Sequence, residues 1–232
     1  MTLKINFKML PWQQARKLPI YVYGKMKFRN FKGRIVIDVD EVHSGMIKVG
    51  KCDYYVATAV QQTIWNITGT MIFKGPTRFM QGSYILVAGN ATLEIGARDV
   101  IFGTNLRIFC FDHIVLGDHV RMAWDVQIMD TSFHYIELRH KDNLVKPLTK
   151  PVIVNEFTWV GNRSTISKGT ILPPYSIVSS NSMVNKDYSD CAPDTLFVGV
   201  PAIPKMTGCH RIFDEAREKA LDAQFHYTRT HL

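Results

Sequence analysis

The chain has 232 residues, 46% of them hydrophobic and 21% charged, so it can bury a core and is not a disordered polymer. Its formal charge of 28 − 20 = +8 suits nucleic acid, an anionic membrane face or a phosphorylated ligand. However, the sequence shows no nucleic-acid-binding motif, no apolar window long enough for a membrane span and no apolar run of signal-peptide type. We therefore expect a cytoplasmic protein with no nucleic-acid partner and no membrane span.

The first 31 residues precede any repeat and contain two apolar segments with proline, Leu10-Pro11-Trp12 and Leu18-Pro19-Ile20. We expect residues 1–31 to cap one end of a repeat structure, since terminal repeats need a cover. Further along the chain, short segments resemble single repeats of a coil, namely Ile35-Val36-Ile37, Ile47-Lys48-Val49-Gly50, Leu93-Glu94-Ile95-Gly96 and Leu116-Gly117-Asp118. We place the repeats in residues 32–204 and a tail in residues 205–232.

A strict six-residue period runs through the second half of the chain. The aliphatic positions are Val154, Val160, Ile166, Leu172, Val178 and Val184, and a small hydroxylated residue stands two places before each of the last five, at Thr158, Ser164, Thr170, Ser176 and Ser182. A second run of this kind is Leu116, Met122 and Ile128, with Val120 and Val126 between them.

A period of six fits neither an amphipathic helix nor an alternating strand. It fits a coil that turns a corner every six residues, so that three sides complete a turn of 18. Parallel strands of successive turns then pair, and the aliphatic residues face inward. The pattern predicts an all-β fold, a parallel β-helix.

The period is interrupted between Ile128 and Val154, where 26 residues replace the usual six. This predicts a 20-residue loop at about residues 130–150, and it contains His134 and His140. Long loops in compact repeat folds are usually functional or disordered. In the tail, Phe213, Ala216, Ala220 and Ala223 are spaced as on one face of a helix, which predicts a C-terminal cap or a helix that packs in a trimer.

Four segments, in order and in phase, resemble motifs of the hexapeptide-repeat sugar O-acetyltransferases. They are WDVQIMDT (124–131) followed by His134, FTWVGN (157–162), SSNSMVNKD (179–187) and VGVPA (198–202). The resemblance covers residues 93–205 well and the first coils loosely, and it is closest to the maltose/galactoside and the capsular or exopolysaccharide enzymes. Ser179 and Ser180 replace two glycines of the family, and Ile203 replaces a basic residue that helps to hold nucleotide phosphates.

The resemblance implies a left-handed parallel β-helix that assembles as a homotrimer, with active sites between neighbouring coils. It implies acetyl-CoA as co-substrate, a carbohydrate acceptor, direct transfer to a hydroxyl and no metal. It also implies a loop histidine as general base, which is His134 by position; His140 is the rival. A base in reach of a hydroxyl contributes roughly 10²–10⁴-fold, and imidazole suits the task at neutral pH.

Three polar residues have two interpretations each. Asp130 either orients His134 or accepts hydrogen bonds from corner backbone amides. Asp125 is a second candidate for the orienting role or a sugar ligand. Asn105 resembles a sugar-contacting asparagine, or it is a corner residue in a left-handed conformation.

The period also suggests where the donor binds. Asn162 and Ser180 are 18 residues apart, and Trp124 is 18 below Asn162 once the loop is excised. These three residues should line one edge of the coil, where a pantetheine arm can lie. Trp159 either walls this groove or packs, and the backbone N–H of Asn162 is a candidate oxyanion donor. Lys186 and Lys205 are candidate contacts for the CoA phosphates, the latter in place of the missing basic residue.

Other functions remain as alternatives. The γ-class carbonic anhydrases use a similar coil with a histidine-bound zinc, and His113 and His119 are six apart, as are His134 and His140. No three histidines match that family's pattern. A non-catalytic scaffold is a second alternative, and a serine or other small-molecule acetyltransferase is a third. The serine enzymes usually carry a helical N-terminal domain, which this sequence lacks.

Overall fold

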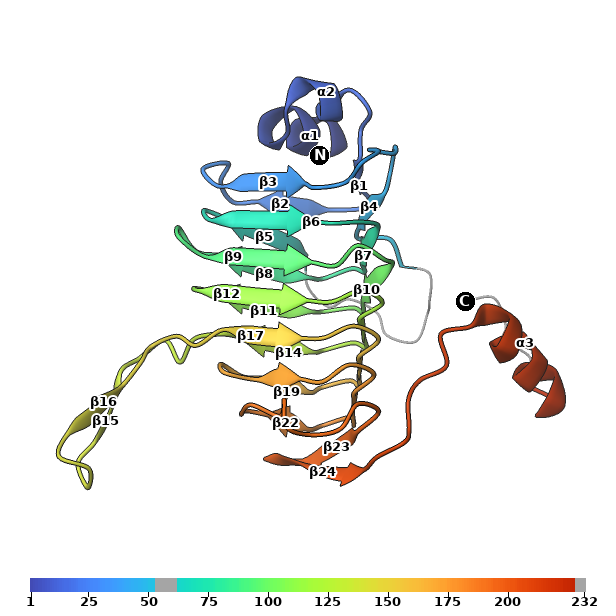
Figure 1. Ribbon diagram of the computed structural model, residues 1–232. Helices are drawn as coiled ribbons and strands as arrows, with labels where there is room; N and C mark the ends of the chain where they lie inside the picture. Colours follow the sequence, from blue (N-terminus) through green and yellow to red (C-terminus); the bar gives the residue numbers. More distant parts are fainter. Residues whose placement is uncertain (53–61, 228–232) are drawn as a thin grey trace.

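The computed structural model describes residues 1–52 and 62–227 and confirms the expected left-handed parallel β-helix (Figure 1). Three sheets of parallel strands form the sides of the coil, and the chain visits them in rotation. The first sheet contains β1 (Ile20–Val22), β4 (Ile47–Val49), β7 (Thr77–Phe79), β10 (Val100–Phe102), β13 (Arg121–Met122), β18 (Trp159–Val160), β21 (Ile177–Val178), β23 (Leu196–Gly199) and the antiparallel β24 (Ala202–Met206).

The second sheet contains β2 (Met26–Phe28), β5 (Thr63–Ile67), β8 (Tyr84–Val87), β11 (Arg107–Cys110), β14 (Gln127–Met129), β19 (Thr165–Ile166) and β22 (Met183–Val184). The third sheet contains β3 (Arg34–Ile37), β6 (Thr70–Phe73), β9 (Thr92–Ile95), β12 (His113–Leu116), β17 (Val152–Val154) and β20 (Ile171–Leu172). We call the edge between the first and second sheets the first corner, that between the second and third the second corner, and that between the third and first the third corner.

The inward positions of the six-residue period are confirmed. All six aliphatic residues from Val154 to Val184 have no exposed surface, and the hydroxylated residues that precede them are buried as well. Strand register explains this, because Val160 pairs with Met122 on one side and with Val178 on the other. Each turn therefore adds its side chains to one continuous apolar core.

The coil begins well before residue 32. β1 pairs with β4 and β2 pairs with β5 in the same parallel registers as later strands, so residues 20–31 already belong to the first turn. The helices α1 (Thr2–Met9) and α2 (Trp12–Ala15) cover the end of the coil (Figure 1). Asn6 holds this cover in place through two hydrogen bonds to Ile20. Its side-chain nitrogen donates to the Ile20 carbonyl oxygen (2.7 Å), and its side-chain oxygen accepts from the Ile20 amide (3.1 Å).

The extruded loop is present at the expected place. It leaves the second corner after β14, forms an antiparallel hairpin of β15 (Ile136–Leu138) and β16 (Leu144–Lys146), and returns at β17. Figure 1 shows the hairpin projecting away from the coil.

The C-terminal end of the coil is covered by the β23–β24 hairpin. The predicted helix exists as α3 (Glu215–Gln224), but none of its residues is buried, so it does not cap the coil. The segment between β24 and α3 instead runs back along the coil (Figure 1). Within residues 1–52 and 62–227, no helix has the length and apolar character needed to cross a membrane.

Candidate functional site

Trp124, Asn162 and Ser180 stack on successive turns at the first corner. The Arg163 amide donates to the carbonyl oxygen of Trp124 (3.1 Å), and the Asn181 amide donates to that of Asn162 (2.9 Å). The Ser180 hydroxyl donates to the side-chain oxygen of Asn162 (2.6 Å). The structure thus brings the three residues of the predicted donor edge together, and we call them the corner column.

Gly161 makes this close stacking possible. A Cβ atom at this position would lie 2.5 Å from the backbone nitrogen of Ser180, closer than real Cβ atoms come. The residue at the next corner position is left-handed on each turn, as at Asn105, Asp125 and Arg163, with φ of 58°, 59° and 58°. A left-handed residue turns the chain sharply, and asparagine and aspartate tolerate it best.

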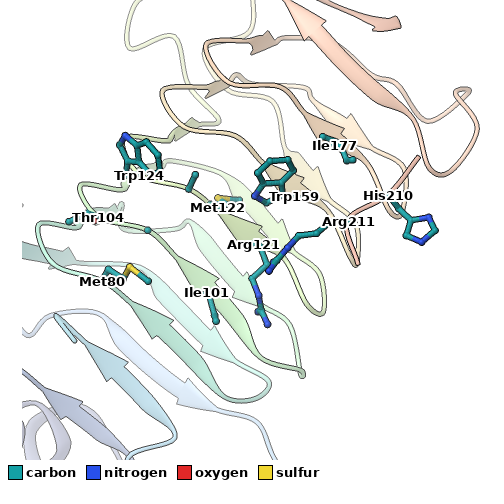
Figure 2. Close-up of a pocket in the computed structure, with 12 residues that line it drawn as sticks. Met80, Ile101, Thr104, Arg121, Met122, Trp124, Trp159, Ile177, His210 and Arg211 are labelled. Atoms are coloured by element: carbon teal, nitrogen blue, oxygen red, sulfur yellow. The ribbon is translucent and has the colours of Figure 1, made fainter. Parts of the chain in front are cut away.

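A cavity of about 540 Å³ lies beside the corner column, on the outer face of the first sheet. Its lining is Met80, Ile101, Gly103, Thr104, Arg121, Met122, Ala123, Trp124, Trp159, Ile177, His210 and Arg211. Figure 2 shows Trp124 at one end of the lining and His210 at the other, with Trp159, Arg121 and the side chain of Arg211 between them. Trp159 is 37% exposed, so it forms a wall of the cavity and is not part of the core.

Two cationic side chains at the cavity were missed by the sequence reasoning. Arg121 projects from β13, and its guanidinium contacts the backbone oxygen and the carboxylate of Asp99. Arg211 comes from the segment before α3, and its guanidinium carbon lies 5.0 Å from the ring centre of Phe213. The outward phase of the repeat could have identified Arg121, but nothing periodic points to Arg211.

The segment that carries His210 and Arg211 is attached at the third corner. There the rings of His119, Phe157 and Tyr175 stack on successive turns at 4.6 Å spacing. Phe213 packs against Phe157 (5.4 Å), and the Nδ1 atom of His210 lies 3.2 Å from a carboxylate oxygen of Asp194. Burial lowers the pKa of His119, and the charge of Arg121 adds to this effect.

His134 lies on a different edge from the corner column, because the loop leaves from the second corner. Its side chain is exposed, and its ring makes no hydrogen bond with any residue that the structure describes. The loop root around it is held to the coil, since Lys168 donates to the carbonyl oxygens of Pro147 (2.6 Å) and Leu148 (3.1 Å). His140 lies at the hairpin tip, and it is also exposed.

The carboxylate of Asp130 accepts two backbone hydrogen bonds within the coil. Its two carboxylate oxygens accept the backbone amides of Phe111 and Asp112, each at 2.8 Å, on the turn below. Burial raises the pKa of Asp130, and these amide hydrogen bonds oppose the rise. The corner at residues 111–112 exposes amides that need an acceptor, so the structure supports the backbone-bonding interpretation of this residue.

Asn105 and Asp125 contact each other at the first corner. The Asn105 amide nitrogen donates to a carboxylate oxygen of Asp125 (3.1 Å). The Asn105 side-chain oxygen is buried and has no hydrogen-bond partner among the described residues. Both residues are left-handed, which agrees with the corner interpretation.

Lys186 and Lys205 are not part of the cavity lining. Lys186 follows β22 at the second corner, with its ammonium 5.4 Å from the ring centre of Tyr188. Lys205 is exposed on β24, two residues after the exposed Ile203.

The histidines of the metal alternative are also separated. His113 lies on the third sheet, where its Nε2 is 2.8 Å from Glu94, whereas His119 lies at the third corner. In the part of the chain that the structure describes, no group of three His, Cys, Asp or Glu side chains is placed to hold a metal ion.

Comparison of the sequence with family models and with curated proteins gives no match. The structure is similar to that of the polySia specific acetyltransferase NeuO, at 20% identity and a TM-score of 0.52, over 89% of this chain and 99% of the other. Two similarities have a lower TM-score of 0.43. One is to the polysialic acid O-acetyltransferase OatWY, at 15% identity over 90% of this chain and 85% of the other. The second is to the acetyl-CoA complex of the hexapeptide-repeat acetyltransferase VCA0836 from Vibrio cholerae O1 biovar eltor, at 26% identity over 57% of this chain and 64% of the other. The similarity to NeuO identifies the fold, and this chain shares with it the left-handed parallel β-helix.

Proposed function

We propose that the protein is an O-acetyltransferase that transfers acetyl from acetyl-CoA to a carbohydrate hydroxyl, in the biosynthesis or modification of a surface polysaccharide. The observation that carries this proposal is the corner column of Trp124, Asn162 and Ser180 beside an apolar cavity walled by Trp159. A pantetheine arm needs a narrow apolar groove with a few hydrogen-bonding groups along it. The four motif segments support the proposal, as does the similarity in fold to NeuO, a polySia specific acetyltransferase.

The residues have separate tasks in this proposal. The co-substrate supplies a thioester carbonyl that the acceptor hydroxyl attacks. His134 takes the hydroxyl proton as the new C–O bond forms and returns it to the sulfur as the C–S bond breaks. The backbone N–H of Asn162, which has no hydrogen-bond partner among the described residues, donates to the carbonyl oxygen as its negative charge develops. Arg121 and Arg211, which both line the cavity, offer positive charge for the phosphates of the co-substrate.

The protein acts as a homotrimer in this proposal. His134 projects from the second corner, and the corner column lies at the first corner, so a single chain holds them on different edges. The hairpin extends away from its own coil (Figure 1). Three coils side by side allow the loop of one subunit to reach the column of the next, and each active site then takes residues from two chains.

The direct test is an assay of free CoA thiol release by the purified protein, with acetyl-CoA and a panel of acidic and neutral oligosaccharides. Acceptor-dependent release with matching acetylation of one hydroxyl is the expected result. Acetyl-CoA should also raise the melting temperature, because a ligand that binds only the native state stabilises it. Absence of both acceptor-dependent release and thermal stabilisation would overturn the proposal. If the protein sedimented as a monomer and retained full activity, only the proposal of an active site shared between two chains would be overturned.

A further inference from the structure

The positive charge of this protein is concentrated at one end of the sequence. Residues 1–37 contain nine lysines and arginines and no aspartate or glutamate: Lys4, Lys8, Arg16, Lys17, Lys25, Lys27, Arg29, Lys32 and Arg34. The remaining residues carry 28 − 9 = 19 basic and 20 acidic side chains, a balance of −1. The excess charge of the whole chain therefore comes from the N-terminal cap and the first turn of the coil.

These nine side chains are available to a partner. Every one of them is exposed, and none forms an ion pair with a residue in the described ranges 1–52 and 62–227. The cap lies across one end of the coil (Figure 1). We call this surface, formed by α1, α2 and the first turn, the basic end.

The basic end also presents large apolar side chains. α1 turns Ile5 and Met9 inward, so its outer face carries Leu3 and Phe7, which are 62% and 44% exposed. Trp12 is 67% exposed, and its ring centre lies 5.5 Å from that of Phe7. Exposed apolar side chains that gather in this way mark interaction sites more often than an ordinary solvated surface.

The orientation of this face is fixed by buried contacts. Asn6 joins α1 to β1 through two hydrogen bonds to Ile20, and both residues are fully buried. Lys4 and Lys8 lie on either side of Phe7 in the sequence and are exposed, and the ammonium of Lys4 lies 5.1 Å from the ring centre of Phe31. The exposed apolar residues of α1 therefore lie on the same helix as exposed positive charges, at the end of the coil.

We propose that the basic end is a docking surface for an anionic phospholipid bilayer. Leucine, phenylalanine and tryptophan insert at the boundary between headgroups and acyl chains, and the flanking lysines and arginines attract anionic headgroups. A purely ionic polymer would use the lysines but leave Leu3, Phe7 and Trp12 without a role. A second copy of this chain, docked through the same surface, would place its nine positive charges against nine others, and the two surfaces would repel each other.

Co-sedimentation with liposomes tests the proposal without any acyl donor or acceptor, so its outcome is independent of the proposed function. The full-length protein should bind vesicles of phosphatidylcholine mixed with phosphatidylglycerol, and it should bind pure phosphatidylcholine vesicles much more weakly. Replacing Lys4 and Lys8 with glutamine should weaken binding by about five-fold for each charge. Phe7→Ser with Trp12→Ser should weaken it by about ten-fold or more, because the apolar insertion is lost.

Matched control variants come from α3, which carries similar side chains far from the cap. Arg217→Gln with Lys219→Gln controls for charge, and Phe225→Ser, at a residue that is 70% exposed, controls for apolar surface. Both controls should bind like the unaltered protein, and all variants should keep its far-UV circular dichroism. Equal loss in the cap and control variants would overturn the proposal. The proposal would also be overturned if the Phe7 and Trp12 substitutions left vesicle binding unchanged and the protein bound dextran sulfate equally well, since this pattern would indicate a polyanion partner.

Discussion

The hydroxyl of Ser180 donates a hydrogen bond to the side-chain oxygen of Asn162, 2.6 Å away on the preceding turn of the coil. The two residues are 18 positions apart, which is one turn here, so the contact is set by the length of the repeat. Ser180 replaces a glycine of the resembled family and adds a side chain to the corner column.

Ser180→Ala should raise the KM for acetyl-CoA by about three- to ten-fold, the equivalent of one neutral hydrogen bond, while kcat changes little. The reason is that the Asn162 side chain loses the group that orients it beside the proposed donor groove. Initial rates over a range of acetyl-CoA concentrations would measure this. Ser44→Ala, at an exposed residue far from the column, should leave KM unchanged, and an unchanged KM in Ser180→Ala would remove the column from donor binding.

Gly161→Ala should destabilise the coil by about 1–3 kcal/mol, because the added methyl group meets the backbone of Ser180. Gly89→Ala is the matched control, since a Cβ atom there would meet nothing within 4 Å. Urea unfolding of both variants gives the comparison. Equal stability of the two would show that the corner relaxes without cost.

His134→Ala should lower kcat by about 10²–10⁴-fold and leave the KM for acetyl-CoA nearly unchanged. The physical reason is that the proposed base acts in the transition state, whereas the proposed donor groove is built by the coil. His140→Ala, at the hairpin tip, should have little effect on kcat. If steady-state kinetics gave the reverse result, the base would be His140.

Asp130→Ala should cost roughly 2–4 kcal/mol of stability, because two partly buried backbone amides lose their acceptor. Asp130→Asn should cost less, since its single side-chain oxygen can still accept one of the amides. Glu137→Ala, at an exposed residue of the hairpin, is the control. Thermal unfolding measures all three, and a neutral Asp130→Ala would contradict the role assigned to this carboxylate.

The Glu94 carboxylate should stabilise the fold above acidic pH. The pKa of Glu94 lies below its ordinary 4.5, first because Lys74 hydrogen-bonds to it, and burial opposes this shift while His113 reinforces it. A carboxyl whose pKa is lower in the folded state contributes stability above pH 4.5 and loses it as the pH falls through the folded-state pKa. The stability difference between the unaltered protein and Glu94→Gln should therefore be present at neutral pH, at less than about 1 kcal/mol, and disappear in acid.

Urea titrations at several pH values would measure this difference. Glu41→Gln is the control, because the pair of Glu41 with His43 is long, at 3.9 Å, and largely exposed. A difference for Glu94→Gln that persists below the folded-state pKa would show that its contribution is not electrostatic.

The coil and the corner column could be predicted from the sequence because both depend on local repetition. A residue such as Val160 faces inward because its six-residue phase fixes the side of the chain on which it lies, and pairing with the turns above and below preserves that phase. For the same reason, the vertical stacking of Asn162 and Ser180 followed from counting 18 residues. The loop was predictable as an interruption of the count.

Only the tertiary structure decided the rest. The first turn was placed too late, because β1 and β2 depart from the strict period and their membership depends on pairing with β4 and β5. Asp130 binds amides 18 and 19 residues earlier in the chain, a partnership that no motif encodes. Arg211 lines the cavity because Phe213, two residues later, packs on the aromatic stack of the third corner. The packing of a non-periodic tail against a repeat depends on a surface shape that exists only after the coil has formed.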